Sequence, residues 1–365
     1  MTPSARGRSE LSVVVPGNLE TRTGGYAYDR RIIGGLRAAG WTVAVHSLDA
    51  SFPFPTSAAR AQAASMFDAI PDGRLVLADG LALGALPDEI APHAARLTIV
   101  ALVHHPLALE TGLTPDRAAA LEASERRALA SARAVVVTSR ATAAALARYG
   151  VPPDRVSIVE PGTDPAPVAR STIDADRSRA DEATLLCVAT ITPRKGHELL
   201  LDALASAPRP WRLRCAGSAD RDERTTARVR DRIRAHGFDA RVDLLGDLDA
   251  ARLAVEYDHA DLFVLATFYE GYGMAVAEAL ARGLPVVATA TGAIADLVGR
   301  DAGIVVPPGD AGALASALDA VLGDAELRAR LAAGARRVRV RLPTWEHAAL
   351  GMAGALARAR ELAHG

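Results

Sequence analysis

Short runs of apolar and often β-branched residues alternate along this chain with longer stretches rich in alanine, leucine and arginine. The short runs have the length and composition of buried strands, and the longer stretches have the length of helices. A helix is expected at 26–39, ended by Gly40. In the first part of the chain the expected strands are 11–15, 41–48, 74–78, 97–103, 134–138 and 156–159. The run at 81–86 fits neither state clearly.

The pattern is interrupted at 161–182, which contains three prolines and many small or charged residues. A segment without apolar periodicity and with this composition is typical of a linker. The alternation then resumes, with two helices expected after Asp310 and a last one at 344–363. The expected strands of this second part are 184–190, 211–216, 242–245, 262–266, 285–289 and 303–306.

Strand and helix alternation of this kind predicts an α/β protein with two doubly wound, Rossmann-like domains. We expect a first domain over 1–165, a linker over 166–182, a second domain over 183–343 and a C-terminal helix over 344–365. In such sheets a ligand binds outside the carboxyl ends of the strands. The expected site is therefore a cleft between the two domains.

Composition excludes several classes of function. The 365 residues are 50% hydrophobic and carry a net charge of −1, with both signs mixed along the chain, so a nucleic-acid partner is not expected. Cys187 and Cys215 form no CxxC pair and lie in apolar surroundings, which indicates buried small side chains rather than a metal site. No run of about 18 apolar residues is present. We expect a cytoplasmic protein with at most peripheral membrane contact.

Lys195 is the only lysine among the 42 lysines and arginines of the chain. It follows Arg194 in the segment TPRKG. An ammonium group on a thin stem can approach a phosphate where a planar guanidinium does not fit. We therefore expect Lys195 and Arg194 to bind a phosphorylated ligand.

The densest signal lies at 266–278, with the sequence ATFYEGYGMAVAE. An expected strand ends there, glycines flank Tyr272, and an apolar helix follows. Its N-terminus is suited to an anion such as a diphosphate. Glu270 and Glu278 lie roughly 80° and 12 Å apart on a helical path, which is too far for a close catalytic pair. They are better placed to accept hydrogen bonds from hydroxyls on two parts of one long ligand, as in a nucleotide sugar.

This spacing resembles the E-x7-E signature of retaining GT-B glycosyltransferases of the family-4 type. The resemblance extends to VATITPRKGHELLLDAL, CAGS, LLGDLD and PGTD, and so covers most of the chain. It implies that Arg194 and Lys195 contact the donor diphosphate, Glu270 the transferred sugar and Glu278 the ribose. It further implies that backbone N–H groups of Tyr272, Gly273, Met274 and Ala275 meet the sugar and phosphate, and that Gly217 and Leu248 lie near the base.

In the first domain, Gly24 and Gly25 follow a strand and open a helix, but the pattern is not GxGxxG. By resemblance, this loop lies near the donor phosphates and the acceptor. His104 ends an expected strand, and similar enzymes often have a histidine there, near the 6-position of the sugar and the acceptor. The family pattern is often His-Asp, whereas this chain has His-His-Pro, so no role is assigned to His105. By the same resemblance, the C-terminal helix packs back on the first domain.

Three Asp-x-Asp triplets occur, at 174–176, 220–222 and 247–249, and are expected to be solvated charges rather than a metal site. Because cations and a helix terminus can neutralise a diphosphate, the expected reaction needs no metal and no other cofactor. The expected activity is retaining transfer from a nucleoside-diphosphate sugar to a saccharide, lipid or small metabolite. A sugar-nucleotide epimerase and a non-catalytic nucleotide-sugar binder remain as alternatives. Segment 51–65 is the expected acceptor loop.

Overall fold

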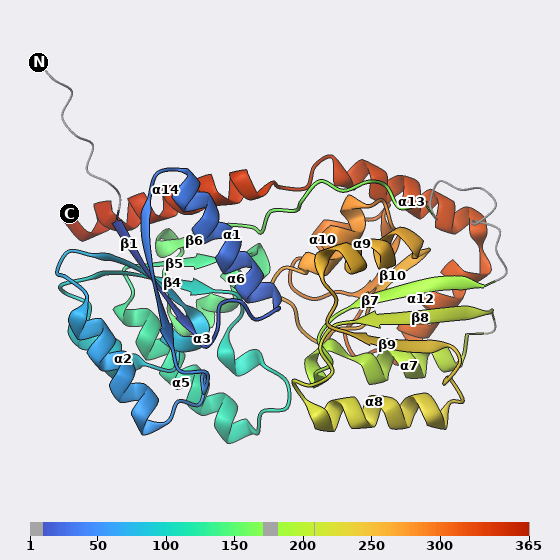
Figure 1. The fold of residues 1–365 in the computed structure, drawn as a ribbon, viewed down its shortest axis with the longest axis horizontal. Helices are drawn as coiled ribbons and strands as arrows, with labels where there is room; N and C mark the ends of the chain where they lie inside the picture. Colours follow the sequence, from blue (N-terminus) through green and yellow to red (C-terminus); the bar gives the residue numbers. More distant parts are fainter. Residues whose placement is uncertain (1–9, 171–181, 208, 365) are drawn as a thin grey trace, which may run out of the picture. The chain divides into compact units, whose positions relative to one another are not determined.

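The computed structural model describes residues 10–170, 182–207 and 209–364. These residues form two compact units (Figure 1). Unit 1 contains the described residues up to Gly162 and those from Pro343 onward, and unit 2 contains those from Thr163 to Leu342. The expected triplet at 174–176 lies outside the described residues, as does most of the expected linker.

Unit 1 is built on a six-stranded parallel sheet with the order β2-β1-β3-β4-β5-β6. The chain leaves β1 for β2 on one side and then crosses to β3 on the other, so the topological switch point lies between β1 and β3. The strands are β1 (Glu10–Pro16), β2 (Thr42–Leu48), β3 (Leu75–Asp79), β4 (Thr98–Val103), β5 (Ala134–Val137) and β6 (Val156–Ile158).

The helices of unit 1 bury their apolar positions against this sheet. In the first helix the buried positions Ile32, Ile33 and Leu36 share one face, and the Thr23 hydroxyl caps the N-terminus by accepting from the Tyr26 N–H at 3.4 Å. The helices are α1 (Gly24–Ala38), α2 (Ser57–Ala69), α3 (Gly80–Leu83), α4 (Pro87–Ile90), α5 (Pro115–Ser131), α6 (Arg140–Ala145) and α14 (Trp345–His364). The last of these, α14, lies against α1 (Figure 1).

Unit 2 repeats this plan with a parallel sheet of order β12-β11-β10-β7-β8-β9. Its chain begins at β7, proceeds to β8 and β9, and then crosses to β10, so the switch point lies between β7 and β10. The strands are β7 (Ala183–Val188), β8 (Trp211–Ala216), β9 (Val242–Gly246), β10 (Leu262–Leu265), β11 (Val286–Thr289) and β12 (Gly303–Val306).

The helices of unit 2 enclose a core in which the residues of the central strands β10 and β11 are fully buried. Cys187 and Cys215 belong to this core, which confirms their assignment as buried side chains, and they are register partners in β7 and β8. The helices are α7 (His197–Ala205), α8 (Glu223–Ala235), α9 (Ala250–His259), α10 (Met274–Ala281), α11 (Ile294–Val298), α12 (Ala311–Gly323) and α13 (Ala325–Arg339).

The structure confirms the expected strands to within one or two residues at each end, and with them the two-domain Rossmann-like fold. The ambiguous run at 81–86 begins in the short helix α3 and continues as turns. The expected loop at 51–65 is wrong in its second half, because α2 begins at Ser57. Its Thr56 cap accepts from the Ala59 N–H, and Ala59, Ala63 and Phe67 make a buried face. The expectation rested on prolines and serines and overlooked this cap.

Candidate active site

In unit 2, two loops meet at the carboxyl edge of the sheet. One follows β7 and carries Arg194 and Lys195, and the other follows β10 and carries Glu270. Because β7 and β10 are neighbours at the switch point, the loops lie side by side, where doubly wound sheets bind ligands. The Phe268 N–H and the Thr267 hydroxyl both donate to the Arg194 carbonyl, at 2.8 and 2.9 Å. These bonds fix the two loops to each other.

The charged side chains of the two loops converge. The Lys195 ammonium donates a hydrogen bond to Glu270 Oε1. Arg194 Nη1 lies 3.7 Å from the same oxygen and donates to the Tyr269 carbonyl at 2.8 Å. Two cations thus surround one carboxylate, and all three side chains are only 12–19% exposed. The arrangement presents a fixed positive edge together with a hydrogen-bond acceptor.

Gly196 explains how the first loop comes so close to the second. Its φ of +66° lies in the left-handed region, and a Cβ there would lie 2.1 Å from the Ala266 carbonyl oxygen. Only glycine combines this conformation with this approach. The short 3-10 turn Pro193–Lys195 is thereby held against the end of β10.

The helix α10 begins directly after the Glu270 loop, and Gly273 precedes it in a left-handed conformation with no side-chain cap. A helix begins with N–H groups that have no acceptor within the helix, here those of Met274, Ala275 and Val276, since the Ala277 N–H is the first to bond to a carbonyl of the same helix, that of Gly273. The side chain of Tyr272 is buried and packs with Ala277. At Tyr272, therefore, the backbone is available for ligand contact and the side chain is not.

Glu278 lies one to two turns into α10, and its Oε2 accepts a hydrogen bond from the Tyr257 hydroxyl at 2.9 Å. Burial raises the pKa of Glu278, against the opposing effects of this hydrogen bond and of Arg282. The partner, Tyr257, is fully buried on α9. The carboxylate is thus oriented by a neighbouring helix, as expected for a binding group.

Gly217 and Leu248 follow β8 and β9, the strands beyond β7. The Gly217 N–H donates to the Gly246 carbonyl at 2.9 Å, so these two loops also lie together at the carboxyl edge. Apart from Glu278, which lies further along α10, the expected residues of unit 2 are in loops or at the helix start along this edge.

In unit 1 the corresponding edge carries Gly24, Gly25 and His104. Gly24 and Gly25 open α1 after β1, and His104 follows β4. The Gly25 Cα is close to the imidazole, since a Cβ there would lie 3.5 Å from His104 Cδ2. Tyr28 meets the same ring edge-on, with ring centroids 5.3 Å apart. The glycine loop and the histidine therefore belong to one site.

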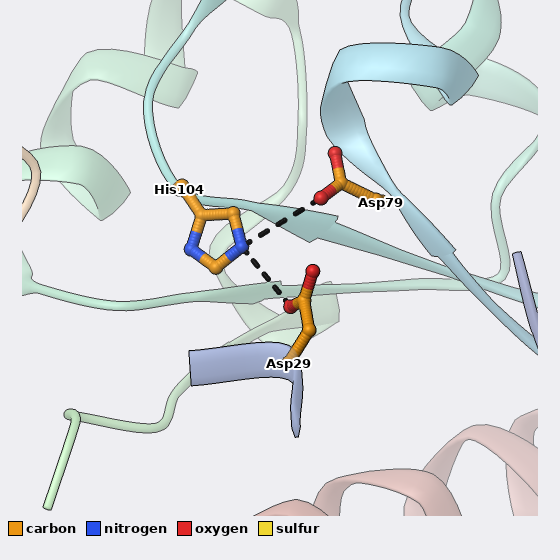
Figure 2. Close-up of side chains that lie close together, drawn as sticks. All are labelled: Asp29, Asp79 and His104. Carbon is orange, nitrogen blue, oxygen red and sulfur yellow. Dashed lines mark hydrogen bonds and ion pairs between the residues drawn. The ribbon is translucent and has the colours of Figure 1, made fainter. Parts of the chain in front are cut away.

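Two aspartates that the sequence did not single out surround His104 (Figure 2). Its Nε2 lies 3.2 Å from Asp29 Oδ1 and 3.8 Å from Asp79 Oδ2. Burial and the neighbouring Asp29 carboxylate raise the pKa of Asp79. Burial alone lowers the pKa of His104, but the hydrogen bond that its imidazole donates to Asp29 and the charges of both aspartates raise it. Among the described residues, this is the group of side chains with the geometry to hold a metal ion.

Comparison with known proteins now decides the family. The description "Glycosyltransferase Family 4" matches residues 26–167, and "Glycosyl transferases group 1" matches residues 170–338. Sucrose-phosphate synthase from Thermosynechococcus elongatus superposes with a TM-score of 0.80 at 24% identity, covering 96% of this chain and 98% of its own. HepE from Anabaena, solved with UDP and glucose, gives 0.75 at 18% identity, covering 96% and 100%. The chain belongs to the glycosyltransferases of the GT-B fold.

Curated relatives of this GT-B glycosyltransferase include two D-inositol 3-phosphate glycosyltransferases. That of Xylanimonas cellulosilytica is 35% identical over 64% of this chain and 59% of its own length. That of Jonesia denitrificans is 30% identical over 69% and 63%. The chain thus spans about three fifths of the length of these relatives.

Two of the Asp-x-Asp triplets that were considered as metal sites lie at helix starts. In the GT-B glycosyltransferase, Asp222 and Asp249 from two Asp-x-Asp triplets cap helices α8 and α9, accepting from the N–H groups of Thr225 and Arg252 at 2.9 and 2.8 Å. Helix capping is the role that the structure shows for these two aspartates. None of the helices in the described part of the chain combines the length and apolar character needed to cross a bilayer.

Sequence reasoning missed Asp29, Asp79 and Tyr257. Asp79 is the last residue of an apolar strand, at the carboxyl edge of the sheet, and this position in the sequence could have marked it as a candidate site residue. Asp29 occupies a buried position of an otherwise apolar helix face, which is a second such signal. The partner of Glu278 left no local signal, because Tyr257 lies on a different helix.

Proposed function

We propose that this chain transfers a sugar from a nucleoside-diphosphate sugar to an acceptor hydroxyl with retention of anomeric configuration. The observation that carries the proposal is the convergence of Lys195, Arg194 and Glu270 at the carboxyl edge of unit 2, next to the start of α10. A ligand that needs two cations, helix N–H groups and a carboxylate side by side combines phosphates with hydroxyls.

Each group of unit 2 has a role in this proposal. Lys195, Arg194 and the first N–H groups of α10 hold the diphosphate. Glu270 accepts hydrogen bonds from the transferred sugar, and Glu278 accepts them from the ribose. Gly217 and Leu248 border the base.

The rate acceleration follows from charge development. Breaking the sugar–phosphate bond leaves an oxocarbenium-like sugar and increases negative charge on the leaving diphosphate. Donors fixed in place before the reaction stabilise that charge without reorganisation. Lys195 is held in this way by Glu270. The two cations and the helix terminus balance the diphosphate, so the step needs no metal on the phosphates.

Without a protein nucleophile, retention requires the acceptor hydroxyl to attack the sugar on the same face from which the diphosphate leaves. Glu270 is engaged by Lys195, so it acts as a positioning group rather than a nucleophile. The departing phosphate then accepts the proton of the acceptor hydroxyl on the same face. Gly24, Gly25 and His104 serve the acceptor side and the 6-position of the sugar.

The names of the curated relatives favour a small hydroxylated metabolite as the acceptor, ahead of a saccharide or a lipid. We also propose that the protein is cytoplasmic and has no nucleic-acid partner.

The test begins with a thermal-shift screen of nucleoside diphosphates and their sugars, since a ligand that binds only the native state raises its stability. The donor so identified is then incubated with candidate acceptors, and nucleoside diphosphate release and the anomer formed are followed by NMR. We expect an α-linked product from an α-linked donor. Conversion of the donor without nucleoside diphosphate release would instead indicate an epimerase, and binding without any conversion would indicate a non-catalytic binder.

Lys195→Ala should lower turnover by about 10²-fold or more, the scale for losing one such donor. Arg230→Ala, an exposed position on α8, is the matched control and should retain wild-type turnover. Wild-type turnover in Lys195→Ala would refute the assignment of the diphosphate site.

A further inference from the structure

Two buried threonines lie next to the loop of Arg194 and Lys195 in unit 2. Thr267 is the second residue after β10, and Thr289 is the last residue of β11. Both side chains are 0% exposed, so neither can contact a bound ligand. Their hydroxyl groups can act on the site only through the residues to which they are hydrogen-bonded.

The Thr267 hydroxyl contacts both ends of Arg194. Its oxygen lies 2.9 Å from the Arg194 carbonyl oxygen and 2.9 Å from that of Tyr269. The Tyr269 carbonyl also accepts a hydrogen bond from Arg194 Nη1 at 2.8 Å. A hydroxyl has one proton and donates to one carbonyl at a time, and here both lie equally near. One side chain thus holds the backbone of Arg194 and the carbonyl that anchors its guanidinium.

Thr289 holds Thr267 from the next strand. Its hydroxyl donates to the Thr267 carbonyl. In the sheet, β11 neighbours β10 and β10 neighbours β7. The hydrogen bonds therefore run from β11 through Thr267 to the loop that follows β7. Because they are buried, each group that lost its partner would cost free energy.

The turn that carries the two cations is too short to fix its own position. Arg194 and Lys195 lie in the single 3-10 turn Pro193–Lys195, and such turns have few internal hydrogen bonds of good geometry. The place of this turn relative to Glu270 depends on contacts with the chain that follows β10. At the Arg194 carbonyl these contacts are the Phe268 N–H and the Thr267 hydroxyl.

We propose that Thr267, supported by Thr289, is a positioning residue of the donor site. Its hydroxyl fixes the turn of Arg194 and Lys195 against the Glu270 loop, so that both cations meet the leaving diphosphate in one geometry. This inference rests on the function proposed above. Without the hydroxyl, the Arg194 and Tyr269 carbonyls lose a donor that they share. A displacement of about 1 Å in groups that hold a reacting ligand can cost about 10²-fold in rate.

Binding of inorganic pyrophosphate to the full chain, measured calorimetrically, tests the positioning role without donor or acceptor. Thr267→Val keeps the shape of the side chain and removes the hydroxyl, so it should weaken binding by about 10-fold. Thr267→Ser restores the hydroxyl and should bind within about 3-fold of wild type. Thr226→Val is the matched control, because Thr226 is 2% exposed on α8 and donates to the Ala219 carbonyl at 2.6 Å. It should bind pyrophosphate as the wild type does.

Turnover separates positioning from a general loss of stability. With the donor found in the thermal-shift screen, Thr267→Val should lower kcat by about 10-fold or more and leave the KM of the acceptor unchanged. Thr289→Val should change kcat in the same direction by a smaller factor. Its effect should be less than additive with that of Thr267→Val, since both act through one hydrogen-bonded chain. A variant that is only less stable would show wild-type kcat once corrected for the folded fraction.

Hydrogen exchange without any ligand gives a readout that does not depend on the transferase assignment. The Phe268 N–H should exchange faster in Thr267→Val than in wild type, and at the wild-type rate in Thr267→Ser. The proposal is overturned if Thr267→Val binds pyrophosphate and turns over as the wild type does. If Thr267→Val does not fold, Thr289→Val and its rescue Thr289→Ser take its place in each measurement. A wild-type chain that binds no pyrophosphate would instead refute the diphosphate site, and Phe268 exchange would still report whether Thr267 holds the turn.

Discussion

At the scale of single residues, the site of unit 2 depends on side chains that orient other side chains. Glu278 is the expected ribose ligand, and the Tyr257 hydroxyl fixes its Oε2 from a neighbouring helix. Lys195 and Glu270 fix each other in the same way. Because such pairs hold the side chains in place before a ligand arrives, less conformational entropy is lost when the ligand binds.

Tyr257→Phe tests this orientation. The substitution removes one hydrogen bond and leaves the buried ring, so the donor should bind about 2- to 10-fold more weakly, corresponding to about 0.5–1.5 kcal/mol. Calorimetric titration with the donor found in the thermal-shift screen measures the change. Tyr149→Phe, which alters another buried tyrosine in unit 1, should leave donor affinity at the wild-type value. Equal affinities of wild type and Tyr257→Phe would remove Glu278 from the ribose site.

Glu125 provides a pH-dependent prediction for stability. It is 1% exposed on α5, and its Oε2 accepts from the Leu107 N–H at 2.9 Å. Burial raises the pKa of Glu125 to about 8 from 4.5, partly offset by this hydrogen bond. Since the folded state holds the proton more tightly, the contribution of Glu125 to stability is complete below pH 4.5. It declines as the pH rises toward 8.

The free energy of unfolding of Glu125→Gln, compared with wild type in urea, isolates this contribution. The free energy of unfolding of the variant should rise relative to that of wild type by about 2–4 kcal/mol between pH 5 and pH 8, because glutamine has no charge to bury. For Glu160→Gln, at an exposed position, the difference in free energy of unfolding from wild type should stay constant over the same pH range. A flat difference for Glu125→Gln as well would mean that the carboxyl ionises normally in the folded chain.

At the scale of elements, contact between α1 and α14 depends on one glycine. A Cβ at Gly35 would lie 2.5 Å from the Ala349 Cβ on α14, whereas a Cβ at Gly34 would meet nothing within 4 Å. Both positions lie in the same helix, so alanine raises helix propensity equally at each, by about 1 kcal/mol. The two positions therefore form a matched pair.

Gly34→Ala should be neutral or stabilising by up to about 1 kcal/mol. Gly35→Ala should be about 1–3 kcal/mol less stable than Gly34→Ala, because the added methyl group overpacks the contact with α14. Urea unfolding of both variants measures the difference. If the two variants have the same stability, α14 does not pack against α1 as closely as described.

The sequence predicted the strands well because the central ones, such as β4 and β10, are continuous apolar runs buried on both faces of a parallel sheet. It also indicated the Glu270 loop, since the glycines and the helix start lie within one segment. It could not reveal the order of strands in the sheets, and therefore could not show that the loops after β7 and β10 are neighbours. Asp29, Asp79 and His104 come together only through that order, which is why the cluster was missed.

At the scale of the whole molecule, two units of the same plan present different chemistry at their switch points. Unit 2 has two cations around a carboxylate, and unit 1 has two carboxylates around an imidazole. The first arrangement favours an anion, whereas the second pairs its own imidazole with its own carboxylates. One fold thus supports different electrostatic environments through the residues that follow its strands.

The placement of the diphosphate site in unit 2 predicts a local response to ligand, measured by hydrogen exchange of the full chain. Nucleoside diphosphate should slow exchange in the unit 2 loops 192–197 and 266–276, because the ligand bridges the segments that carry Lys195 and Glu270. Lys195→Ala should abolish this response. Protection by nucleoside diphosphate confined to unit 1 would contradict the placement of the diphosphate site.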